Sequence, residues 1–422
     1  MGSLSVERSV ELSVEAARAL PGPAWLVERR TAAAERALGA PLPTSAQEVW
    51  RYSPIDQLDL SAYHPADPAP PGRPEITGLA AAVVEALAER SGLVVTVDGA
   101  LVHAEGDRLV VEEASAELLG AVAPPHDALT DLHDAFAASP LALVVPRGRA
   151  VAEPLVVVHV VTGGGVVACP RLVVHAREGS EASVVEVFVG ADDPAGALVL
   201  PFTALVVDQG AHLRHAAVQA LGPAAWSLGH AGSQVGRDAT LQSLVVALGG
   251  AYARLRTDAA LTGQAGESTL LAVYVGDGDQ VHDFRTMQEH VAPRTRSDLV
   301  FKGAVGGRSQ SVYSGLIKVH KGAKGTQAFQ TNRNLVLSET AQAFSVPNLE
   351  IDENDLACSH ASAVGPIDPQ QRFYLEARGV PPEVADRLIV LGFLDDVLAR
   401  SPLPGLRGPI AMELARRVEV AT

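Results

Sequence analysis

The sequence has few of the residue types on which nucleic-acid and membrane binding depend. Aromatic residues make up 4% of the 422 residues, and 33 Lys and Arg stand against 49 Asp and Glu, so the formal net charge is −16. Such a chain repels phosphate backbones and anionic lipids at long range. No apolar run reaches the roughly 18 residues of a membrane span, and residues 1–20 contain no apolar signal core. We therefore expect no nucleic-acid partner, no membrane association and no export signal.

Cysteine is almost absent. Cys169 and Cys358 are the two cysteines, and they lie far apart without any C-x-x-C spacing. This argues against a disulfide framework and against a self-contained zinc site. Isolated thiols fit the reducing cytosol, so we expect a cytoplasmic protein.

Motifs for nucleotide hydrolysis and for common hydrolases are also missing. The chain contains no G-x-x-x-x-G-K-[ST], no H-E-x-x-H and no G-x-S-x-G. Residues 163–168 match G-x-G-x-x-A, but Pro170 and another Val-rich segment follow, which leaves no room for the helix of a dinucleotide loop. Any ATP-driven step must come from another chain.

Helical periodicity is found toward the two ends of the chain. Apolar residues recur at helical spacing from Val14 to Leu38, and helices are also expected at 77–90 and 129–138. After Pro366 the helical period returns in DPQQRFYLEARGV and again from Pro381 onward.

From about Leu141 to Pro366 the sequence is typical of strands. Short Val-rich runs such as PLVVVHVV and SVVEVFVG are separated by Gly, Asp, Glu and Ser. Turn-like pieces recur at uneven intervals without helix signals, which favours a stacked coil of strands over a sandwich. We predict a mainly β protein with three regions: a mainly helical N-terminal region at 1–140, a β-solenoid core at 141–366 and a C-terminal helical domain at 367–422.

The stretch NLEIDENDLACSHASAVG contains the first candidate metal site. Cys358 and His360 are two residues apart, and on a strand both side chains would share one face with Cβ atoms roughly 7 Å apart. Thiolate and imidazole are both iron ligands. The alternative is structural: a small buried cysteine beside a hydrogen-bonded histidine at the end of a strand.

The second candidate is GDGDQVHDFRTMQEH, which gathers carboxylates and imidazoles that could chelate a hard or borderline metal. As an alternative, the Asp-Gly-Asp part is a solvated turn, and an extended segment would point neighbouring side chains to opposite faces. The candidate residues are Asp277, Asp279, His282, Asp283 and His290.

Together these segments resemble the SufB/SufD family of iron-sulfur assembly scaffolds, over nearly the whole chain. The markers are PLPTSAQEVWRYSPIDQLDL at 41–60, VPRGRAVAEPLVVVHVV, the run from His282 to Ser297 with SQSVYSGLIKV after it, and NLEIDENDLACSHASAVGPIDPQQRFYLEARGV. The Cys-Ser-His motif at 358–360 favours the SufD branch. The chain departs from many relatives at Ala361, which stands where they have glycine.

The resemblance implies a right-handed parallel β-helix between helical regions, and a non-catalytic scaffold that pairs with a SufB-like chain. Its Cys-x-His pair, Cys358 and His360, would share a transient iron-sulfur cluster or iron with that partner. The C-terminal helices would dock a SufC-like ABC-type ATPase. Flavin is a further candidate cofactor of the complex, and a homodimer is a candidate state of the unpartnered chain. The residues expected to bind the ATPase are Phe373, Tyr374, Arg378, Leu388 and Leu391.

Two other functions stay open at this point. A β-helix polysaccharide lyase or hydrolase would use Asp277, Asp279 and Asp283 as paired acids. A purely structural adaptor would have no metal role, and replacing Cys358 and His360 would then leave cluster yield unchanged.

Overall fold

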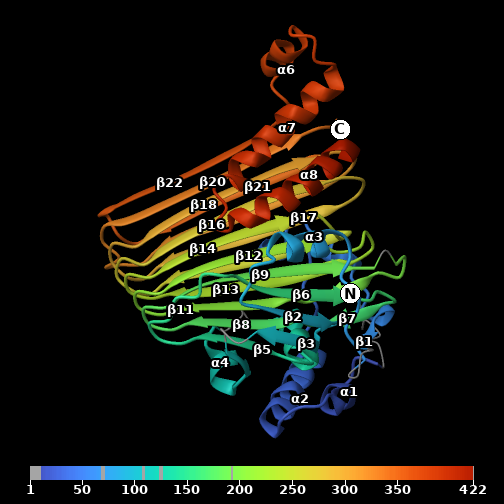
Figure 1. Cartoon of the computed structure of the whole chain (residues 1–422), viewed down its shortest axis with the longest axis vertical. Coiled ribbons are helices and arrows are strands. Elements are labelled where there is room, and N and C mark those ends of the chain that lie inside the picture. Colours follow the sequence, from blue (N-terminus) through green and yellow to red (C-terminus); the bar gives the residue numbers. More distant parts are fainter. Residues whose placement is uncertain (1–10, 68–71, 107–109, 123–126, 192, 422) are drawn as a thin grey trace.

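A computed structural model describes residues 11–67, 72–106, 110–122, 127–191 and 193–421, with the side chains of 110–113 excepted. Residues 1–10, which belong to the stretch expected to lack an export signal, lie outside this description. The protein is mainly β, with a solenoid of about eight turns and helices toward both ends of the chain, as Figure 1 shows. The predicted solenoid fold is therefore confirmed. Among the described residues, no helix is both long enough and apolar enough to cross a membrane.

The solenoid consists of two long sheets, because consecutive strands of the coil alternate between them. We call them sheet A and sheet B. The strands of sheet A are β4 (Val110–Glu113), β5 (Leu141–Val145), β8 (Arg171–Ala176), β11 (Phe202–Val207), β13 (Trp226–Val235), β15 (Tyr252–Leu261), β17 (Val281–His290), β19 (Gln310–Val319) and β21 (Gln342–Ile351), with β1 (His64–Pro65), β7 (Val166–Ala168) and β10 (Ala197–Val199) beside them. The strands of sheet B are β3 (Ala100–Gly106), β2 (Gly92–Val97), β6 (Leu155–Val161), β9 (Glu181–Gly190), β12 (His212–Ala220), β14 (Thr240–Ala247), β16 (Glu267–Gly276), β18 (Arg296–Val305), β20 (Thr326–Val336) and β22 (Leu356–Gly365).

Within each sheet the coil strands pair in parallel and in register, so side chains stack in columns from one turn to the next. Side chains alternate between the two faces of a strand, which gives every turn an inward and an outward set. The inward sets of the early turns form an apolar core between the sheets, for example Leu155, Val184, Leu205 and Leu213. Small branched side chains fill such thin layers well.

The two ends of the solenoid differ. At the first end each sheet finishes with an antiparallel strand, because β3 pairs with β2 and β4 with β5, and the β2–β3 pairing is interrupted by a bulge. At the other end β21 and β22 are the last strands, each ten residues long, and nothing in the described part of the chain pairs with their outer edges. The region 1–140, predicted as mainly helical, therefore also supplies β2, β3 and β4 to the two sheets.

Most helices lie on the outer faces of the sheets (Figure 1). Those toward the N-terminus are α1 (Val14–Ala19), α2 (Ala24–Gly39), η1 (Glu48–Trp50), η2 (Ile55–Gln57), η3 (Leu60–Ala62), α3 (Gly78–Ala86), α4 (Ala116–Gly120) and α5 (Ala128–Phe136). Those toward the C-terminus are α6 (Pro369–Glu376), α7 (Pro382–Leu398), η4 (Pro404–Leu406) and α8 (Arg407–Ala421). The helical pattern from Val14 to Leu38 is two helices, because Pro21 and Pro23 interrupt it.

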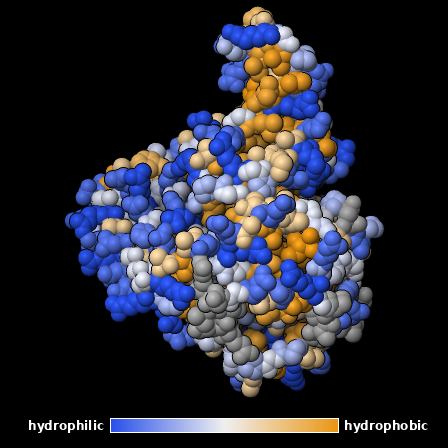
Figure 2. All heavy atoms as spheres, viewed as in Figure 1, coloured by the Kyte–Doolittle hydropathy of each residue, from blue (hydrophilic) through white to orange (hydrophobic). Residues whose placement is uncertain are grey.

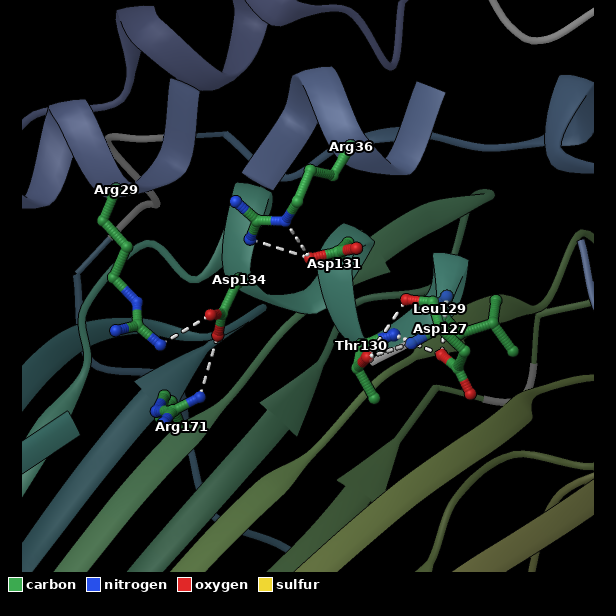
Figure 3. A network of polar contacts seen from close by, with 8 residues as sticks. All are labelled: Arg29, Arg36, Asp127, Leu129, Thr130, Asp131, Asp134 and Arg171. Carbon is green, nitrogen blue, oxygen red and sulfur yellow. Dashed lines mark hydrogen bonds and ion pairs between the residues drawn. The ribbon is translucent and has the colours of Figure 1, made fainter. Parts of the chain in front are cut away.

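Ion pairs join α2 to α5, and α5 to sheet A. Figure 3 shows Asp134 of α5 between Arg29 of α2 and Arg171 of β8, at 2.6 and 2.8 Å. Arg36 of α2 reaches Asp131 of α5 at 2.8 Å. On the other side of the solenoid, α3, α7 and α8 pack on the apolar outer face of sheet B. Figure 1 shows α6 and α7 near the open end, whereas α1 and α2 lie near the first end.

Candidate functional site

The open end of the solenoid carries the pair Cys358 and His360. Both lie on β22, where the register places Cys358 next to Ala328 and His360 next to Gln330 of β20. Ala328 and Gln330 are buried inside the solenoid, and Cys358 packs against the same interior cluster as Ala328. Because residues two apart on a strand share a face, both groups project from the inward face of β22. A thiol and an imidazole are thus neighbours on the last turn.

This pair is accessible because the last turn has no turn above it. Cys358 is half-buried and His360 is exposed. The neighbouring strand shows the same effect: Ile317 of β19 is fully buried, whereas Leu349, its partner in β21, is 39% exposed. The last turn therefore presents interior side chains at the surface.

Partial burial raises the pKa of the Cys358 thiol. The thiol is therefore protonated at neutral pH, and a metal would have to displace the proton, since the thiolate is the form that binds metal. No three His, Cys, Asp or Glu residues in the described ranges are grouped so that they could hold a metal ion. A metal bound by Cys358 and His360 would therefore need further ligands from other groups.

Asp283 is committed to a structural network. Its carboxylate accepts from Arg254 at 2.8 Å, from Arg285 at 2.6 Å and from the hydroxyl of Tyr252 at 2.9 Å. The side chain is completely buried on the outward face of β17. A carboxylate held by two guanidinium groups is saturated with donors, so little capacity for metal remains.

The two histidines of the same segment are also held apart from Asp283. His282 faces the opposite side of β17, and its Nε2 lies 3.1 Å from the carbonyl oxygen of Val275. His290 contacts the hydroxyls of Thr295 and Ser297 at 2.7 and 2.9 Å. Burial lowers the pKa of each of these histidines to about 4, so both are neutral at pH 7. The structure does not bring His282, Asp283 and His290 together.

The carboxylates that a sugar-cleaving enzyme would need are likewise occupied. Asp279 lies exposed in the turn before β17 and forms an ion pair with Arg308 at 2.5 Å. This hydrogen bond lowers the pKa of Asp279, which makes it a poor general acid. Asp279 is 70% exposed and Asp283 is fully buried, so the two carboxylates lie in different surroundings.

Sequence reasoning missed a charged cluster inside the solenoid. Glu186 of β9 accepts from Thr203 at 2.8 Å and contacts the Nε2 atoms of His159 and His215 at 3.3 and 2.9 Å. All four residues are at least nine-tenths buried. The available signal was a single glutamate in the otherwise apolar run SVVEVFVG. We call these four residues the Glu186 cluster.

The C-terminal helices expose the predicted docking residues unequally. Phe373 and Tyr374 of α6 are 70% and 56% exposed, and Arg378 stacks on Tyr374 with 3.5 Å between the guanidinium carbon and the ring centre. Leu388 of α7 is 50% exposed, whereas Leu391 packs against the apolar layer on sheet B. Figure 1 shows α6 standing clear of the solenoid, and Figure 2 shows hydrophobic surface on these projecting helices.

Comparisons with known proteins agree on one family. The model of the SUF system FeS cluster assembly SufBD core domain matches residues 159–393. An iron-sulfur cluster assembly SufBD family protein of Mycobacterium tuberculosis is 32% identical over 286 residues, which is 66% of this chain and 71% of the relative. The iron-sulfur cluster assembly protein SufD of Escherichia coli is 29% identical over 390 residues, 89% of each chain. SufD of Bacillus subtilis is 27% identical over 292 residues, 69% of this chain and 67% of the relative.

Proposed function

Since the chain belongs to the SufBD family of iron-sulfur cluster assembly proteins, we propose that it is a SufD-like scaffold subunit without catalytic activity of its own. In this proposal it pairs with a SufB-like chain and with SufC-like ATPases, and the complex builds nascent clusters in the cytoplasm. A reducing compartment keeps Cys358 in the thiol form.

The observation that carries the proposal is the position of Cys358 and His360 at an open strand edge. Long unpaired edge strands with exposed apolar side chains are templates for pairing with another chain. A partner that covers β21 and β22 would bring its own ligands to the thiol and the imidazole. Iron-sulfur clusters usually take four protein ligands, so a site shared between two chains fits the two that this chain offers. Without a partner, a second copy of the chain would occupy the same edges.

Each ligand has a distinct task in this arrangement. The cluster or iron is the cargo, and binding it releases the proton of Cys358. A ring nitrogen of His360 supplies a ligand that adds no charge. Burial of the last turn by the partner would exclude water from both groups. Any flavin belongs, in this proposal, to the complex and not to this chain alone.

The site is tested by Cys358→Ser and His360→Ala in a complex reconstituted with SufB-like and SufC-like partners. We expect the complex to form and its iron, sulfide and cluster absorbance to fall well below wild type. Ser359→Ala is the matched control, because Ser359 lies between the two on the other face of β22 and is exposed. Unchanged cluster yield in both site variants would support the structural adaptor instead.

We propose that the exposed aromatic and apolar side chains of α6 and α7 dock the ATPase. Deleting the whole C-terminal segment would uncover sheet B, because α7 and α8 pack on it, so point substitutions are the better test. Phe373→Ser and Leu388→Ser should each weaken ATPase binding in size-exclusion or calorimetric assays. Met412→Ser on α8 is the control, since Met412 is equally exposed at 67% but lies on another helix. Equal binding by all three variants would refute this docking surface.

A further inference from the structure

A buried carboxamide without a partner lies directly beneath the exposed imidazole of the open end. Gln330 of β20 is 2% exposed and stands in register with His360 of β22. Neither the oxygen nor the nitrogen of its side chain has a hydrogen-bond partner in the part of the chain that the structure describes. His360 likewise makes no hydrogen bond to any described residue. Two polar groups that lack partners are therefore stacked in consecutive turns.

The solenoid makes room for this carboxamide. A Cβ atom added at Gly315 of β19 would lie 2.6 and 2.8 Å from the side-chain nitrogen and oxygen of Gln330, so a larger residue there would have to displace the carboxamide. The hydroxyl of Tyr313 borders the same space but is already bonded to Thr286 at 3.0 Å. In its own column Gln330 has Leu299 on one side and His360 on the other. His360 is therefore the polar neighbour that the register offers to Gln330.

A metal-bound histidine needs a group that fixes its second ring nitrogen. Such histidines almost always donate the other ring N–H to a carboxylate, a carbonyl or water, which sets the tautomer and orients the ring. The carboxamide oxygen of Gln330 is an acceptor of this kind. We propose that Gln330 is a positioning residue for His360, accepting the ring N–H when the imidazole binds iron or a nascent cluster. This inference rests on the proposed function.

The state of Gln330 in the isolated chain supports this role. A buried amide without hydrogen bonds costs stability, whereas an apolar side chain of similar shape does not. Replacing Gln330 with methionine should therefore leave the chain folded and at least as stable as wild type. A change in metal binding can then be assigned to the lost acceptor.

The chain contains a matched control at Gln288 of β17. Gln288 is fully buried, and both of its side-chain polar atoms also lack hydrogen-bond partners among the described residues. Its neighbour in the next turn is Ile317, which separates it from the open end. Gln288→Met therefore removes the same chemical group at the same burial, one turn further from His360.

The experiment is a Co²⁺ titration of the reconstituted complex, followed by the thiolate-to-cobalt absorbance that Cys358→Ser removes. We expect Gln330→Met to raise the apparent Kd of this site 10- to 100-fold, the range typical for loss of such supporting groups. Gln288→Met should match wild type. Gln330→Glu keeps the acceptor oxygen that Gln330→Met removes, so it should bind Co²⁺ at least as tightly as wild type.

Three outcomes would overturn the inference. The first is a wild-type Kd for Co²⁺ in Gln330→Met. The second is an equal rise of this Kd in Gln288→Met, and the third is a Kd in Gln330→Glu as weak as that of Gln330→Met. The proposed function fails separately: if Cys358→Ser and His360→Ala leave the cobalt spectrum unchanged, there is no shared metal site for Gln330 to support.

Discussion

The contribution of a buried carboxylate to the free energy of unfolding can be measured at Glu186, inside the solenoid. Burial by itself raises the pKa of Glu186, but the hydrogen bonds and the electrostatic attraction of His159 and His215 outweigh this and lower the pKa to about 2. The ordinary value is 4.5. The folded state therefore favours the ionised carboxylate strongly.

The size of the effect follows from this shift. A difference of about 2.5 pKa units, at 1.36 kcal/mol per unit, corresponds to about 3 kcal/mol. Removing one partner from a buried ion pair typically costs about 3–5 kcal/mol, which agrees. We expect Glu186→Gln to lower the free energy of unfolding by about 3 kcal/mol at pH 7. The amide carries no charge, and its NH₂ group would face a neighbouring hydrogen-bond donor where the carboxylate had an acceptor oxygen.

The pH dependence gives a second test of the same argument. Because the folded pKa is depressed, the stabilisation is fully present above pH 4.5 and is lost as the pH falls from 4.5 toward 2. The difference between wild type and Glu186→Gln should therefore shrink by about 1.4 kcal/mol per pH unit below 4.5.

Urea unfolding followed by circular dichroism at pH 7 and at pH 3.5 measures both quantities. Glu181→Gln is the control on the same strand, since Glu181 is 40% exposed and pairs with Arg214 at the surface. Such pairs contribute about 0–1 kcal/mol. A Glu186→Gln chain that unfolds at the wild-type urea concentration, or a gap that stays constant with pH, would refute the reasoning.

Two further substitutions test the packing of the helices and of the solenoid. Asp134→Asn should lower the free energy of unfolding in urea by about 3–5 kcal/mol, because it removes the counter-charge of the Arg171 guanidinium, which is 1% exposed. A loss below about 1 kcal/mol would contradict this prediction. Gly303→Ala should lower the free energy of unfolding by about 1–3 kcal/mol, because the added methyl group collides with the ring of Tyr274. Gly365→Ala is the control and should be neutral, since its methyl group would meet no described atom within 4 Å. Equal urea midpoints for the two variants would contradict the prediction and show that Tyr274 moves away freely.

Local signals in the sequence predicted most of the fold. Short Val-rich runs separated by Gly, Asp, Glu and Ser identify the strands, and the helices expected at 77–90 and 129–138 appear at Gly78–Ala86 and Ala128–Phe136. The break between α1 and α2 was missed because the apolar spacing continues across the prolines. The strands β2–β4 were missed, and β3 shows one reason, since it is an edge strand with one buried position and gives no alternation.

The site was predictable only in part for a related reason. The spacing of Cys358 and His360 depends on one strand and can be read from it. The neighbours of that pair come from other turns, and their identity depends on the register. Gln330 precedes His360 by a full turn of uneven length, so only the coordinates show that the two share a column. The same holds for the Glu186 cluster, whose members come from four strands.

The difference between the two ends of the solenoid limits how far this protein can assemble. Short antiparallel strands and a bulge protect the first end, and bare ten-residue strands occupy the last. When two copies of the solenoid pair through β21 and β22, the unpaired edges of both copies are covered, so a third copy has no open edge to which it could bind. End-to-end growth into a fibre is thereby stopped at the pair.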